Sequence, residues 1–168
     1  LIMPNLDTPI TTCALLQRYD NEIVCSTGLD FIRMLTMYLT DTLEPDEVRK
    51  ALRFGLARAI KYYPPGLTTN SDKGVKNPSS LWTPGTKPYE SLRALVEHDG
   101  AFLIHAADAL DKNGEELDPY DQEKHFLKET LPRIIDAHDS LKISVEHMST
   151  ADGADEMRYL GKNRPGKR

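Results

Sequence analysis

Apolar residues recur through most of this chain at the three- to four-residue spacing of amphipathic helices. The spacing predicts four helical stretches, over residues 29–39, 45–63, 89–113 and 118–141. The second stretch begins at a proline and stops before two more, because proline fits the first helical turn and interrupts later ones. After residue 26 no convincing alternation of apolar and polar residues follows. The pattern therefore predicts an all-α chain.

The stretch 89–113 carries the clearest periodicity. Its apolar face is formed by Leu92, Leu95, Val96, Leu103, Ala107 and Leu110. Glu97 and Asp108 lie on one line roughly opposite that face, because a separation of 11 residues returns nearly to the same helical angle. Periodicity alone predicts a solvent-exposed acidic stripe here, bordered by His98 and His105.

Three less regular regions surround the predicted helices. Residues 11–26 fit either a short hairpin or a single helical turn. Residues 64–88 hold five prolines and three glycines, and a loop of this length is typically functional or disordered. This loop, with Trp82, could line a substrate channel or lie on the surface. Residues 150–168 are expected to form a polar tail. We expect the whole chain, residues 1–168, to form a single domain.

Composition narrows the classes of function. The chain has 168 residues, 39% of them hydrophobic, which suits one globular domain with a sizeable core. A net charge of −5 gives no basic face for nucleic acid, and no apolar run approaches the roughly 18 residues of a membrane span. Two cysteines are too few for a disulfide scaffold. We expect a partner that is neither nucleic acid nor membrane.

A series of segments in this chain resembles the fungal haem-thiolate peroxidases. Residues 89–101, which include Glu97-His98-Asp99, are similar to the approach to that family's Glu-His-Asp motif. Residues 107–113 resemble its alanine-aspartate run, and residues 117–127 resemble the helix that follows. The matches keep their order from about Cys25 to Asn163. The resemblance implies an all-α fold around haem b, with a possible short N-terminal hairpin.

The resemblance also assigns roles to particular residues. Cys25 would be the thiolate ligand of the haem iron, although Val24 and Ser26 replace the family's flanking prolines. Glu97 and His98 would bind a magnesium or manganese ion beside a haem propionate. His98 and Asp99 would orient a distal glutamate that acts as acid and base, so Glu97, His98 and Asp99 are the predicted catalytic residues.

Two residues depart from the family's pattern. Ala101 stands where the family has a serine that binds the cation. The distal glutamate has no clear counterpart, and the nearest substitutes are Glu146 and Glu156.

The function implied is a peroxidase or peroxygenase that uses hydrogen peroxide to oxidise or oxygenate a small organic molecule. One alternative is a non-haem descendant of the same fold, acting in biosynthesis or as a helical binding subunit. A weaker alternative is an all-α nucleotide pyrophosphohydrolase, based on residues 114–119 with His125. Secretion and a cytoplasmic location both stay open, as does the oligomeric state.

Overall fold

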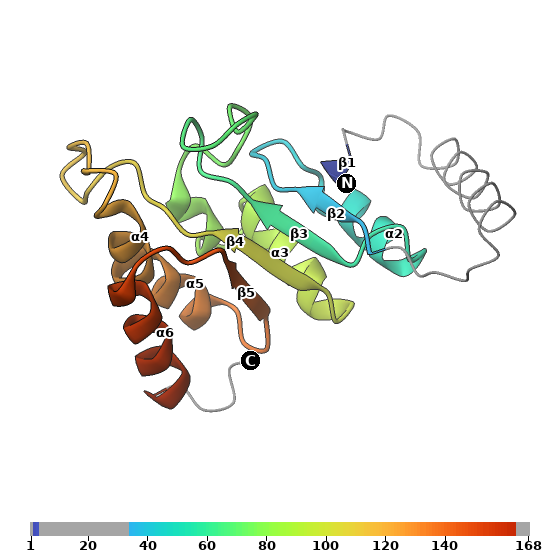
Figure 1. Cartoon of the computed structure of the whole chain (residues 1–168). Helices are drawn as coiled ribbons and strands as arrows, with labels where there is room; N and C mark the ends of the chain where they lie inside the picture. Colours follow the sequence, from blue (N-terminus) through green and yellow to red (C-terminus); the bar gives the residue numbers. More distant parts are fainter. Residues whose placement is uncertain (1, 4–33, 164–168) are drawn as a thin grey trace, which may run out of the picture.

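A computed structural model describes residues 2–3 and 34–163 of the chain (Figure 1). Strands and helices alternate along it. The elements are β1 (Ile2–Met3), β2 (Thr36–Tyr38), α2 (Pro45–Arg53), β3 (Ala59–Tyr62), the 3₁₀ turn η1 (Pro78–Leu81), α3 (Lys87–Glu97), β4 (Ala101–His105), α4 (Gln122–His125), the π-helical turn η2 (Phe126–Thr130), α5 (Leu131–Ala137), β5 (Lys142–Glu146) and α6 (Ala151–Asn163).

The five described strands form one parallel sheet in the order β1-β2-β3-β4-β5. Each strand therefore lies beside the next one in the sequence, and from β2 onward a helical segment makes each crossover. Sequential order without reversal is the arrangement of β/α barrels, whereas doubly wound sheets reverse their order. The fold is thus α/β and resembles part of a barrel.

One face of the sheet packs on helices and forms the core. Ile60, Tyr62, Phe102 and Ile104 are fully buried on this face and join one cluster with side chains of α2, α3 and α5. The Tyr62 ring lies 6.3 Å from the ring of Phe102 and 5.9 Å from that of Phe126. Figure 1 shows α3 behind β3 and β4, on this side of the sheet.

The opposite face of the sheet is more open. Side chains alternate along a strand, so Leu103 and His105 point away from the helices that cover Phe102 and Ile104. Both Leu103 and His105 are only half-buried. Because parallel sheets are generally covered on both faces, this second face is the one that a closed barrel would turn inward.

The prediction of an all-α chain is wrong, and the stretch 89–113 shows why. Helix α3 ends at Glu97, and Asp99 then takes a left-handed φ of 57°. The amide of Gly100 donates to the Leu95 carbonyl at 2.8 Å, and β4 starts at the next residue. A Cβ at position 100 would lie 2.6 Å from the Leu95 side chain, so glycine lets the turn pack closely on the end of α3. Leu103 lies in a strand, and its position at the spacing expected for the preceding helix is a coincidence that made the predicted helix too long.

Two of the other predicted helices also contain strands, whereas the stretch 118–141 is helical through α4, η2 and α5, as predicted. The stretch 45–63 divides into α2 and β3, with Gly55 at a φ of 68° after the end of the helix. The stretch 29–39 contains β2, and its residues 29–33 lie outside the described residues, as does the 11–26 segment. Within the predicted polar tail, Ala151–Asn163 forms α6.

His138 gives the fold a testable pH dependence. It is buried, its Nε2 donates to the Leu81 carbonyl at 2.6 Å, and its Nδ1 has no hydrogen-bond partner in the described part of the chain. Burial lowers the pKa of His138, so the unfolded chain takes up a proton more readily than the folded one. The stability that neutral His138 contributes is complete above about pH 6.5 and falls as the pH drops below it.

We therefore expect the free energy of unfolding to fall more between pH 7 and pH 5 in the wild type than in His138→Gln. Urea denaturation across this pH range measures the difference between the two proteins. Other groups that titrate in both proteins affect both free energies equally and cancel in that difference. Equal pH dependence in the two proteins would show that His138 does not carry the effect.

Candidate functional site

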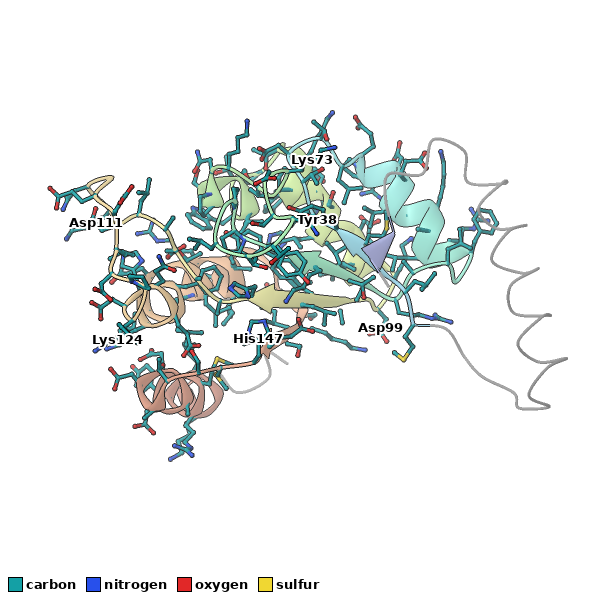
Figure 2. All side chains as sticks on the ribbon, turned by 45° about the horizontal axis from the view of Figure 1, so that its top comes forward. Tyr38, Lys73, Asp99, Asp111, Lys124 and His147 are labelled. Atoms are coloured by element: carbon teal, nitrogen blue, oxygen red, sulfur yellow. The ribbon has the colours of Figure 1, made fainter. Side chains whose placement is uncertain are left out.

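Polar side chains gather where β3, β4 and β5 end. Lys61 lies near the end of β3, His105 is the last residue of β4, and Glu146 is the last of β5. His105 pairs in register with Glu146, and His147 follows directly. Because the carboxyl ends of parallel strands share one edge of the sheet, these residues meet although they are far apart in sequence. Figure 2 shows His147 at this edge.

The two histidines face each other. His105 Nδ1 lies 3.1 Å from His147 Nε2, and the ring centroids are 4.7 Å apart. Burial lowers the pKa of His105, and the neighbouring His147 and Lys61 lower it further. These neighbours favour the neutral form of His105, which is the form that binds a metal ion or accepts a proton.

Lys61 is the buried cation of the site. Only 3% of it is exposed, and its Nζ forms an ion pair with the Glu146 carboxylate. The same Nζ lies 4.8 Å from the centre of the Tyr63 ring. A buried ammonium group is costly without such partners, so Glu146 serves here as the counterion of Lys61.

Hydrogen bonds and close backbone packing hold the loop that follows β3, next to Lys61. Tyr38 donates its hydroxyl to the Ser71 carbonyl at 2.9 Å, and Ser71 Oγ accepts from the Gly66 amide at 2.9 Å. A Cβ on Gly74 would lie 2.1 Å from the Tyr63 carbonyl, so the chain approaches itself closely there. This part of the 64–88 stretch is ordered by its own hydrogen bonds and adjoins the polar edge.

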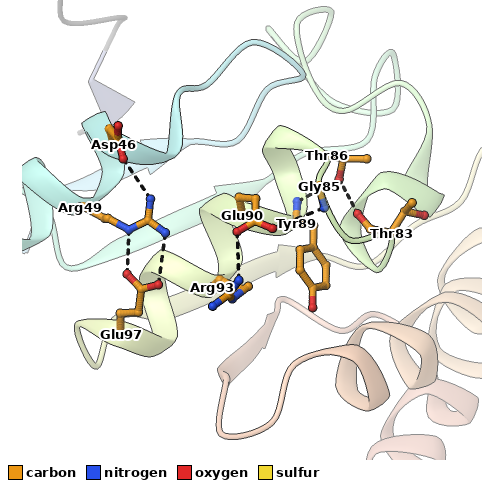
Figure 3. A network of polar contacts seen from close by, with 9 residues as sticks. All are labelled: Asp46, Arg49, Thr83, Gly85, Thr86, Tyr89, Glu90, Arg93 and Glu97. Carbon is orange, nitrogen blue, oxygen red and sulfur yellow. Dashed lines mark hydrogen bonds and ion pairs between the residues drawn. The ribbon is translucent and has the colours of Figure 1, made fainter.

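The predicted residues Glu97, His98 and Asp99 lie at the opposite edge of the sheet, in the turn between α3 and β4. Arg49 donates to both oxygens of Glu97, at 2.7 and 3.2 Å, and this lowers the pKa of Glu97 (Figure 3). His98 is exposed, and Asp99 pairs with Lys142 at 2.5 Å. The structure thus gives these three residues surface contacts and leaves their catalytic role a prediction.

The predicted haem ligand Cys25 lies outside the described residues. Among the described residues, no group of three or more histidine, cysteine, aspartate or glutamate side chains could hold a metal ion. The pair His105 and His147 thus belongs to no such group of three. No helix in the described ranges is both long and apolar enough to cross a bilayer.

Comparison with known proteins shows that the chain is similar to dihydroorotases and not to peroxidases. The chain is 36% identical over 157 residues to the dihydroorotase of Halorhodospira halophila, which covers 92% of this chain and 42% of that protein. It is 35% identical over 164 residues to the dihydroorotase of Vibrio cholerae, with 97% and 45% covered. The chain thus spans less than half the length of these relatives. No family model matches it.

Solved structures agree on the fold. The chain superposes on the crystal structure of Saccharomyces cerevisiae dihydroorotase in complex with 5-fluoroorotic acid, with a TM-score of 0.72 and 24% identity. The match covers 89% of this chain and 40% of that one. Campylobacter jejuni dihydroorotase gives a TM-score of 0.59 over 87% of this chain and 39% of its own. These likenesses support an α/β fold and exclude the all-α one.

The resemblance to haem-thiolate peroxidases is therefore wrong, because the relatives in sequence and structure are dihydroorotases. The predicted oxidoreductase activity and haem b are overturned with it, and the magnesium or manganese site loses the haem propionate on which it depended. The non-haem, binding-subunit and pyrophosphohydrolase alternatives are likewise unsupported.

Sequence reasoning missed Lys61 and His147 and assigned His105 to a surface stripe. The clearest signal was at His105, which directly follows the apolar run Ala101 to Ile104. A polar residue that closes a short apolar run is typical of the carboxyl end of a parallel strand in an α/β enzyme.

Proposed function

We propose that this chain carries part of the active site of a dihydroorotase, a hydrolase that acts on the cyclic amide dihydroorotate. The observation that carries the proposal is the meeting of Lys61, His105 and His147 at the carboxyl ends of three successive parallel strands. This is the edge where β/α barrel enzymes hold their catalytic groups. The similarity to dihydroorotases over more than nine-tenths of the chain supports the same assignment.

The histidine pair fits a divalent transition metal such as zinc. Two nitrogens bound to one tetrahedral zinc lie about 3.4 Å apart, given zinc–nitrogen bonds of about 2.1 Å. The facing nitrogens of His105 and His147 are 3.1 Å apart, so a small adjustment would admit the ion. When bound, zinc would supply Lewis acidity, which polarises a carbonyl and lowers the pKa of water.

The chain's own residues would hold and surround this ion. His105 and His147 provide two imidazoles, whereas catalytic zinc sites generally use three protein ligands. Lys61 lies beside this pair, and the Glu146 carboxylate balances its charge, which offsets its repulsion of a metal cation. Further ligands and the contacts to substrate would come from outside the described residues.

The partner of the site is accordingly a small, anionic pyrimidine-like molecule rather than peroxide. Of the two compartments left open by the sequence, we propose the cytoplasm, because the relatives of the chain are dihydroorotases and not the peroxidases whose members are commonly secreted.

The proposal is tested by measuring dihydroorotate hydrolysis and 5-fluoroorotic acid binding with and without zinc. We expect both to require zinc, to be lost on chelation and to return when zinc is restored. Zinc binding at the histidine pair with neither hydrolysis nor 5-fluoroorotic acid binding would contradict the dihydroorotase assignment.

A further inference from the structure

We propose that Glu123 on α4 is a positioning residue that fixes His147 through the loop between β5 and α6. The role assigned to His147 rests on the proposed function, but the contact itself does not. His147 has a left-handed φ of 41°, which is uncommon for a residue with a side chain and needs support from its surroundings.

The Glu123 carboxylate accepts hydrogen bonds from Ser149 and Thr150, two and three residues after His147. One carboxylate oxygen accepts from the Ser149 amide at 2.8 Å and from the Ser149 hydroxyl at 3.0 Å. The other accepts from the Thr150 amide at 3.1 Å and from the Thr150 hydroxyl. Four donors from two consecutive residues therefore converge on one carboxylate. Both amides stand at the positive start of α6, where a negative charge is stabilised.

Gly153 leaves room for this contact. The Thr150 hydroxyl also accepts from the Gly153 amide at 3.0 Å, so it caps α6 while it donates to Glu123. A Cβ on Gly153 would lie 2.4 Å from a Glu123 carboxylate oxygen. The Glu123 carboxylate thus occupies the space in which a side chain at position 153 would begin, so a Cβ there would displace the carboxylate.

The same two helices offer a contrasting contact. Lys124 pairs with Asp152 at 2.7 Å, and both side chains are largely exposed. Figure 2 shows Lys124 on α4 and His147 at the sheet edge. The Lys124–Asp152 pair joins α4 to α6 and does not involve the residues that follow His147. A variant without this pair therefore tests the contact between the two helices apart from the position of His147.

The experiment compares Gly153→Ala, Glu123→Ala and Glu123→Gln with two controls in the full chain. Gly161→Ala makes the same chemical change in the same helix, where a Cβ would meet nothing within 4 Å. Lys124→Ala breaks only the exposed ion pair. Two properties are measured: the ring resonances of His147 and His105 in metal-free, isotope-labelled protein, and zinc affinity by competition with a chromophoric chelator.

We expect Gly153→Ala and Glu123→Ala to shift the His147 ring resonances and to weaken zinc binding roughly 10- to 100-fold, the usual effect of losing a group that orients a metal ligand. Glu123→Gln keeps one acceptor oxygen and should fall between them and the wild type. Both controls should match the wild type.

Unchanged His147 resonances in Gly153→Ala and Glu123→Ala would overturn the proposal, even if both variants were less stable. If Glu123→Ala does not fold, Gly153→Ala against Gly161→Ala decides the question. If the wild type binds no zinc, the proposed function fails, and the metal-free resonances still decide whether Glu123 positions His147.

Discussion

Replacing His105 or His147 with alanine is expected to weaken zinc binding by about 100-fold or more. Each imidazole is one of the two ligands that we propose for the metal, and loss of a direct ligand should exceed the 10- to 100-fold cost of losing an orienting group. Competition with a chelator measures the affinity. Since neither ring belongs to the fully buried core, circular dichroism should show that both variants fold.

His98→Ala is the matched control for these variants. His98 is exposed at the other end of β4, at the carboxyl cap of α3, and should leave zinc affinity unchanged. Weaker binding in His98→Ala but not in His105→Ala or His147→Ala would place the metal at the Glu97-His98-Asp99 turn and contradict the assignment of the site.

Phe102→Ala is expected to lower the free energy of unfolding by about 3–5 kcal/mol. Phe102 is fully buried on the helix-covered face of the sheet, against Tyr62. Removing the ring loses its transfer free energy and leaves a cavity that its neighbours fill only in part. Because small domains are stable by about 5–15 kcal/mol in total, the loss should be plain in urea denaturation.

Comparing the stability loss of Leu103→Ala with that of Phe102→Ala tests whether these residues form a strand or a helix. Leu103 points to the open face and is half-buried, so its loss should cost only about 1 kcal/mol. The helical spacing predicted the reverse, because it placed Leu103 on the buried face and left Phe102 off it. A larger loss of stability in Leu103→Ala than in Phe102→Ala would contradict the strand assignment.

Local signals predicted the starts of helices well. The helix expected at Pro45 begins there, and α3 begins within two residues of the expected Tyr89. Both starts depend on nearby residues: proline in the first turn, and the Thr86 hydroxyl that accepts from the Tyr89 amide at 3.3 Å. Such contacts lie within a few residues, so the sequence displays them directly.

The strands and the site could not be predicted in the same way. β2, β3 and β4 have only three to five residues each, and apolar runs of that length fit a buried helix as well as a strand. The site depends on contacts between residues distant in sequence: His105 and His147 are 42 residues apart, and Lys61 and Glu146 are 85 apart. Only the order of strands in the sheet brings them together.

Glu97-His98-Asp99 illustrates how a short motif can mislead. Its residues are arranged by the needs of a turn, in which Asp99 takes a left-handed φ and Glu97 anchors α3 to Arg49 of α2. These contacts give Glu97 and Asp99 a structural role in the turn. Family resemblance through short segments is therefore weak unless the strands and helices that carry them also agree.

The most direct test of the account is the anomalous scattering of zinc in crystals of the protein grown with that metal. The account predicts a zinc peak bonded to His105 Nδ1 and His147 Nε2 at about 2.0–2.1 Å, at the carboxyl ends of β4 and β5. A zinc peak at Glu97-His98-Asp99, or crystals with no zinc at the histidine pair, would contradict it.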